Sequence, residues 1–71
     1  MLKHLEVSLP DSCLNKALDN ELIFVLLQRD RAAADTVRYW AKRRIELCLN
    51  SPDDPKIVEA LLAADRMAHT N

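Results

Sequence analysis

Two amphipathic stretches dominate the second half of the chain. Between residues 32 and 49, apolar residues recur at helical spacing, which predicts a helix with one broad apolar face. A second stretch runs from Pro55 to about residue 68, and Asp54 before Pro55 is typical of an N-cap followed by a first helical residue. The loop between them is short, so the helices are expected to pack antiparallel. The side chains expected to face inward are Ala33, Ala34, Val37, Trp40, Ala41, Ile45, Leu47 and Cys48, then Ile57, Val58, Leu61, Leu62, Ala64 and Ala68.

The first half of the chain is less regular. Residues 1–9 alternate apolar and polar positions, which predicts an extended arm that ends at Pro10. Asp11 or Ser12 is placed to cap a short helix. The run Leu22–Leu27 is apolar on every side, which fits a buried helix or a buried strand. We favour a helix, because the N-terminal arm is the one available partner strand, and either form is expected to lie at the centre of the core.

These elements predict an all-α fold in one domain of 71 residues, with an arm over residues 1–10 and a helical core over residues 11–71. The fold is expected to consist of the antiparallel hairpin, a preceding buried helix and the N-terminal extended arm. The chain contains no glycine. That composition excludes glycine-rich phosphate loops and nucleophile elbows, whose backbones depend on glycine.

Charge adds one candidate surface. The net charge is −1, but residues 29–44 hold six Lys and Arg against two Asp, a local charge of +4. Within this stretch Arg38, Tyr39, Lys42 and Arg43 form an exposed basic and aromatic face, of a kind favoured at protein interfaces. An ordinary solvated helix face has the same pattern. An acidic protein surface is the favoured partner, and nucleic acid is less favoured because more positive charge is expected there.

Two charged residues interrupt the apolar faces of the hairpin. Arg44 lies between Trp40 and Leu47 on the first helix, and Asp65 lies among the apolar positions of the second. Helical side chains lean toward their own N-terminus, which directs these two toward each other in an antiparallel hairpin. We predict an Arg44–Asp65 ion pair, with Arg44 stacked on Trp40. Alternatively, both side chains extend to water at the edge of a thin core.

Catalytic and metal-binding patterns are not found in the sequence. Cys13 and Cys48 have no metal-ligand spacing and are expected to be reduced and buried, with a disulfide as the less favoured alternative. His4 and His69 lie near the chain ends and suit no catalytic triad. We therefore expect no enzyme activity and no cofactor. Without a signal peptide or a membrane-length apolar run, a cytoplasmic location and no membrane association are expected.

Two family resemblances point in different directions. Residues 5–14, an alternating segment followed by Leu-Pro and a helical start, resemble the opening of ribbon-helix-helix DNA-binding proteins. Residues 21–67 resemble short helical proteins of phage and prophage genomes, through Phe24-Val25-Leu26, Asp30, Arg38-x-Trp40-Ala41, Ile57-Val58-Glu59-Ala60 and Ala64-Asp65-Arg66-Met67. The second resemblance implies an accessory protein of a phage or mobile element.

Non-enzymatic protein binding is the leading function expected from these observations. The partner would be a host protein whose activity the chain modulates, and a homodimer is compatible with so short a chain. The alternative is a dimeric DNA-binding regulator of ribbon-helix-helix type that uses residues 3–9.

Overall fold

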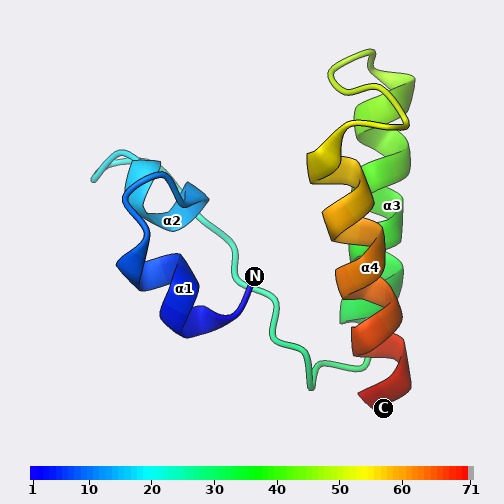
Figure 1. Cartoon of the computed structure of the whole chain (residues 1–71), viewed down its shortest axis with the longest axis horizontal. Helices are drawn as coiled ribbons and strands as arrows, with labels where there is room; N and C mark the ends of the chain where they lie inside the picture. The colour runs from blue at the N-terminus through cyan, green and yellow to red at the C-terminus, as the bar shows by residue number, and fades with distance from the viewer. Residues whose placement is uncertain (71) are drawn as a thin grey trace.

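The computed structural model describes residues 1–70 of the chain, and in these residues every regular element is a helix. The helices are α1 (Lys3–Ser8), α2 (Cys13–Lys16), α3 (Ala33–Glu46) and α4 (Pro55–Thr70). Helix α3 packs against α4 and α1 against α2, while neither α1 nor α2 packs against α3 or α4 (Figure 1). The molecule therefore consists of a long α3–α4 hairpin and a small α1–α2 pair, joined by a non-helical segment.

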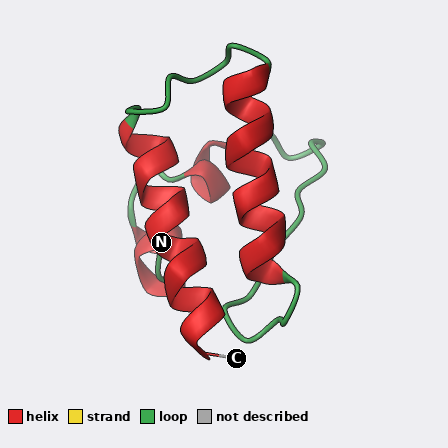
Figure 2. Ribbon diagram, turned by 90° about the vertical axis from the view of Figure 1, so that its right-hand side faces the viewer, coloured by secondary structure: helices red, strands yellow, loops and turns green. Residues whose placement is uncertain are grey.

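The α3–α4 hairpin confirms the predicted antiparallel pair (Figure 2). Small side chains bring the two helices together, because Ala33, Ala34, Ala41 and Ala64 are all buried. Among the residues whose burial the structure describes, Ile57 is the one large side chain that is fully buried, with 0% of its surface exposed. Other positions expected to face inward are exposed in the structure: Trp40, Leu47, Cys48, Val58, Leu61, Leu62 and Ala68. The core is therefore narrow and lies along the contact line of the two helices.

The predicted N-terminal arm is wrong, because residues 3–8 form helix α1. Polar side chains of the next segment fix this helix. The side-chain amide of Asn15 donates to the carbonyls of Glu6, Val7 and Leu9 over 2.8–3.2 Å, which satisfies the C-terminal end of α1. In return, a carboxylate oxygen of Glu6 accepts the Leu14 N–H at 2.9 Å. These non-local bonds override the alternating pattern of residues 1–9.

Helix α2 begins where the sequence indicates. Ser12 is its N-cap, with a hydroxyl that accepts the Asn15 N–H at 3.2 Å and donates to the Glu6 carbonyl. Ser12 is also the one buried residue of the α1–α2 pair. Hydrogen bonds rather than an apolar core therefore hold this pair together.

The prediction of a buried helix at Leu22–Leu27 is also wrong. These residues form an elongated, non-helical segment between α2 and α3, and Leu22 and Phe24 are 99% and 85% exposed (Figure 1). The physical reason lies in the hairpin. Its inner faces are lined with alanine and close on each other, which leaves no apolar groove between α3 and α4 for a third helix.

Helix α3 ends in a left-handed residue that is not glycine. Cys48 has a φ of 60°, and the Leu49 N–H donates to the Arg44 carbonyl at 3.0 Å while the Cys48 N–H donates to the Ile45 carbonyl at 3.0 Å. This is the Schellman arrangement, which usually places glycine at the left-handed position. Both Cys13 and Cys48 are reduced and exposed, so the expectation that they are buried is wrong.

We expect Cys48→Gly to stabilise the protein. Glycine lacks the Cβ atom that makes a positive φ costly, so the gain in unfolding free energy should be about 1 kcal/mol after the added flexibility of the unfolded chain is counted. Thermal unfolding followed by circular dichroism measures this change. Cys48→Ala is the matched control, because it removes the thiol but keeps Cβ; an equal gain in that variant would contradict a backbone origin.

Candidate protein-binding surfaces

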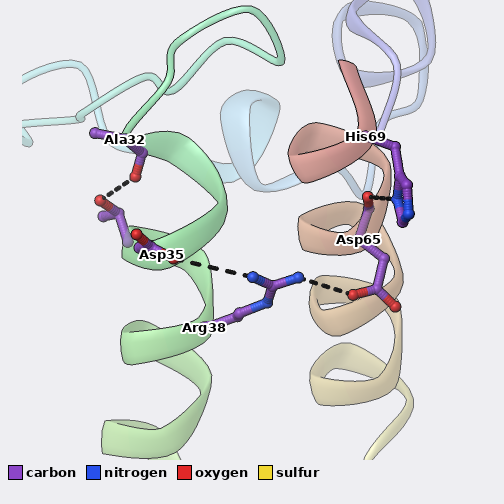
Figure 3. A network of polar contacts seen from close by, with 6 residues as sticks. Ala32, Asp35, Arg38, Asp65 and His69 are labelled. Atoms are coloured by element: carbon purple, nitrogen blue, oxygen red, sulfur yellow. Dashed lines mark hydrogen bonds and ion pairs between the residues drawn. The ribbon is translucent and has the colours of Figure 1, made fainter. Parts of the chain in front are cut away.

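The predicted basic and aromatic face is mostly available in the structure. Tyr39, Lys42 and Arg43 are exposed on α3. Arg38 differs from them, because its guanidinium reaches across to α4 and donates to Asp65 at 3.0 Å, with Asp35 at 3.9 Å on its other side (Figure 3). Tyr39, Lys42 and Arg43 therefore take no part in this bridge between the helices, whereas Arg38 does.

The prediction of an Arg44–Asp65 ion pair is wrong, because a different arginine pairs with Asp65. Asp65 pairs with Arg38, which lies close to the same level of the antiparallel hairpin. An aspartate side chain is too short to span the axial distance from residue 65 to the level of Arg44, whereas the arginine at its own level reaches it directly. The predicted stacking is confirmed, with the Arg44 guanidinium 5.8 Å from the centre of the Trp40 ring.

Arg44 instead begins a chain of polar contacts across the hairpin loop. Its Nε–H donates to the Asn50 side-chain oxygen at 2.6 Å, and the Asn50 amide donates to Asp54 at 2.9 Å. The other carboxylate oxygen of Asp54 accepts the Lys56 N–H at 2.9 Å, which confirms the predicted cap of α4. These contacts lower the pKa of Asp54, chiefly through the Asn50 amide and next through the Lys56 N–H.

This pKa shift predicts an acid dependence of stability. A carboxyl whose pKa is lower in the folded chain favours folding when ionised, and that contribution is lost as the pH falls through the folded pKa. We expect thermal stability to fall more steeply below about pH 4 in the wild type than in Asp54→Asn, which still caps the helix but does not titrate. Melting temperatures across this range test the prediction, and parallel curves would contradict it.

A central groove lies between the α1–α2 pair and the hairpin. It has a volume of about 930 Å³, and its apolar lining comes from three parts of the chain: Leu2, Val7, Leu14, Phe24, Val25 and Met67. A second hollow of about 540 Å³ adjoins it, with Trp40, Arg44 and Cys13 in its wall. Because Cys13 lines both hollows, they form one continuous surface on the facing sides of the two helical pairs.

Three of the polar side chains that line the central groove have partners within the chain. Glu6 accepts the Leu14 N–H, and Gln28 and Arg66 both have interaction partners. In the part of the chain that the structure describes, every buried side-chain nitrogen and oxygen has a hydrogen-bond partner. Small-molecule sites combine an apolar wall with a few polar groups aimed at the ligand. The central groove has a mainly apolar wall, and three of its polar side chains are engaged within the chain, which suits an apolar protein surface better than a polar metabolite.

Sequence reasoning missed this groove because it assigned Leu22–Leu27 to the interior. The useful signal was the continuous apolar run itself, which exceeds what the narrow hairpin is able to bury.

Over residues 1–70, no three His, Cys, Asp or Glu side chains are grouped so that they could hold a metal ion. None of the helices described is both long enough and apolar enough to cross a membrane.

The ribbon-helix-helix interpretation required an extended strand at residues 3–9, and helix α1 occupies that position. No protein-family model matches the chain, and no curated protein or solved structure matches it either. The surfaces of the molecule are therefore the observations that bear on its function.

Proposed function

We propose that this chain is a non-enzymatic protein-binding module whose central groove holds the apolar face of a helix from its partner. The observation that carries this proposal is the groove of about 930 Å³ with apolar walls from α1, α2, α4 and the connecting segment. The resemblance to short phage proteins extends the proposal: the partner would be a host protein whose activity the chain modulates.

An amphipathic helix suits the groove for two reasons. Its apolar stripe presents side chains at every third or fourth position, and these would contact Val7, Phe24 and Met67 without needing a polar partner. The groove wall also includes Met67, and methionine packs against varied apolar shapes. Because the α1–α2 pair does not pack against the hairpin, the two walls can adjust to the inserted helix.

The two exposed cysteines supply a direct test. Cys13 lines the central groove, whereas Cys48 lies beyond the C-terminal end of α3 and lines neither hollow. A benzophenone attached to Cys13 in a Cys48→Ala background should crosslink the partner in a lysate of the source organism. The same group attached to Cys48 in a Cys13→Ala background is the matched control and should give no crosslink.

Two variants then separate the candidate surfaces. Val7→Asp places a charge in the groove at an exposed position and should abolish the crosslink, while a combined alanine variant of Tyr39, Lys42 and Arg43 should retain it. Circular dichroism confirms that both variants keep their helices. The proposal fails if Val7→Asp retains the crosslink, or if labelled Cys13 gives none. A crosslink lost only in the alanine variant would assign binding to the basic face of α3 instead.

A further inference from the structure

Positive charge gathers around the central groove and the second hollow. Among the residues that the structure describes, the charged side chains that line these two features are Lys3, Lys16, Arg44, Lys56 and Arg66, against Glu6, Asp11 and Glu59. The whole chain has ten cationic and eleven acidic residues and a net charge of −1. The lining thus holds half of the cations but only three of the acids, so a surface with a charge of +2 lies on a chain that is otherwise negative.

The three lysines of this lining are open to a partner. Lys3, Lys16 and Lys56 are exposed, and none of them forms an ion pair with another described residue. Lys56 acts on the Asp54 carboxylate through space, without a direct contact between the two charges. Lys3 and Lys16 belong to the α1–α2 pair and Lys56 belongs to α4, so the lysines lie on both walls of the surface.

Helix α4 presents one continuous face to this lining. Its contributing residues recur at helical spacing, and they are Lys56, Glu59, Ala60, Ala63, Arg66 and Met67. From Lys56 to Arg66 the face extends over ten residues, or about 15 Å of helix. The middle of the face consists of alanines, which allow another helix to approach closely. An elongated partner of about three helical turns fits this face.

We propose that the partner helix is acidic, with Asp or Glu residues on both flanks of the apolar stripe that enters the central groove. This inference rests on the proposed function, since it specifies the partner of the same groove. The flanking carboxylates would reach the lysines of the two walls while the stripe contacts the apolar lining. Charge complementarity of this kind selects partners and speeds their association. The cations involved are not those of the basic face of α3, because Lys42 and Arg43 line neither hollow.

Three synthetic peptides of one length test this inference. They share a leucine stripe and a covalent staple that holds them helical, and they differ only at the flanking positions, which are all glutamate, all glutamine or all lysine. Fluorescence anisotropy measures their dissociation constants. The glutamate peptide should bind about tenfold more tightly than the glutamine peptide, and the lysine peptide should bind most weakly. High salt should reduce the advantage of the glutamate peptide, because it screens exposed charges.

A charge-removal variant identifies the cations. Combining Lys3→Gln, Lys16→Gln and Lys56→Gln should weaken binding of the glutamate peptide about tenfold, because three exposed ion pairs each contribute a small amount. Binding of the glutamine peptide should be unchanged, which separates the loss of charge from any change in the groove. Circular dichroism verifies that the variant keeps its helices.

The matched control combines Arg31→Gln, Lys42→Gln and Arg43→Gln. It removes the same number of charges from exposed residues that line neither hollow, and it should bind the glutamate peptide as the wild type does. Equal affinity for the glutamate and glutamine peptides, or an equal loss in the control, would overturn the inference. Binding to phosphatidylglycerol vesicles but to none of the peptides would also overturn it, in favour of a membrane surface.

Failure of this inference is distinguishable from failure of the proposed function. If all three peptides bind equally and Val7→Asp abolishes their binding, the groove holds an apolar helix and only its acidic character is wrong. If no peptide binds, the inference is overturned, and the Cys13 crosslink decides separately whether the groove binds a protein.

Discussion

Ile57→Ala is expected to lower the free energy of unfolding by about 3 kcal/mol. Ile57 is a large side chain that the hairpin buries completely, and it lies in the first turn of α4. Truncation removes its transfer free energy and leaves a cavity in the narrow core of the hairpin. For a chain of this size, whose total stability is only a few times larger, such a loss is severe.

Chemical denaturation at constant pH measures this effect, with helical circular dichroism as the signal. Leu62→Ala is the matched control on the same helix, because the Leu62 side chain is 61% exposed and its truncation leaves no internal cavity. We expect the control to lose well under half as much stability. Similar losses in both variants would mean that a partner or a second copy covers Leu62 in solution.

Ala64→Leu is the second change with a large expected effect, at about 2 kcal/mol of lost stability. Ala64 is fully buried where α4 faces α3, and the close approach of the two helices depends on its small side chain. A leucine at this position would force the helices apart or adopt a strained rotamer. The same separation would loosen the Arg38–Asp65 bridge, because Asp65 is the next residue of α4.

Ala68→Leu provides the control for the added volume. Ala68 lies one helical turn beyond Ala64 but is exposed, so a larger side chain meets water there rather than α3. Its melting temperature should change little, whereas that of Ala64→Leu should fall by roughly 10 °C. A comparable fall in the Ala68 variant would show that the helices also pack closely near the end of α4.

The hairpin was predictable because its signals are local. Asp54 and Pro55 determine where α4 begins, and the apolar periodicity of each helix is long enough to exclude a strand. The position of the short helix after Ser12 follows from the same capping chemistry. The width of the core could not be predicted from the sequence. Alanine fits the apolar pattern of a helix, but it does not indicate how closely two helices approach each other.

The errors occurred where distant contacts decide the structure. Residues 3–8 become helical because Asn15 bonds to the carbonyls at the end of α1, and no short alternating pattern contains that information. The hydrophobicity of Leu22–Leu27 predicts an interior position, although the closed hairpin has no space for it. The sequence correctly predicts that Asp65 bridges the two helices, but the identity of its arginine partner depends on the axial register of the helices to within about one turn.

Because the α1–α2 pair does not pack against the hairpin, the free energy needed to open the pair should differ from the free energy needed to unfold the hairpin. No residue within α1 or α2 is buried, so their amide hydrogens should exchange with solvent through local opening long before the hairpin unfolds. The one tryptophan, Trp40, belongs to α3, so the main change in its fluorescence should follow unfolding of the hairpin. Amide exchange at Leu9 and tryptophan fluorescence should therefore give different stabilities, and the first should rise toward the second whenever a partner occupies the groove.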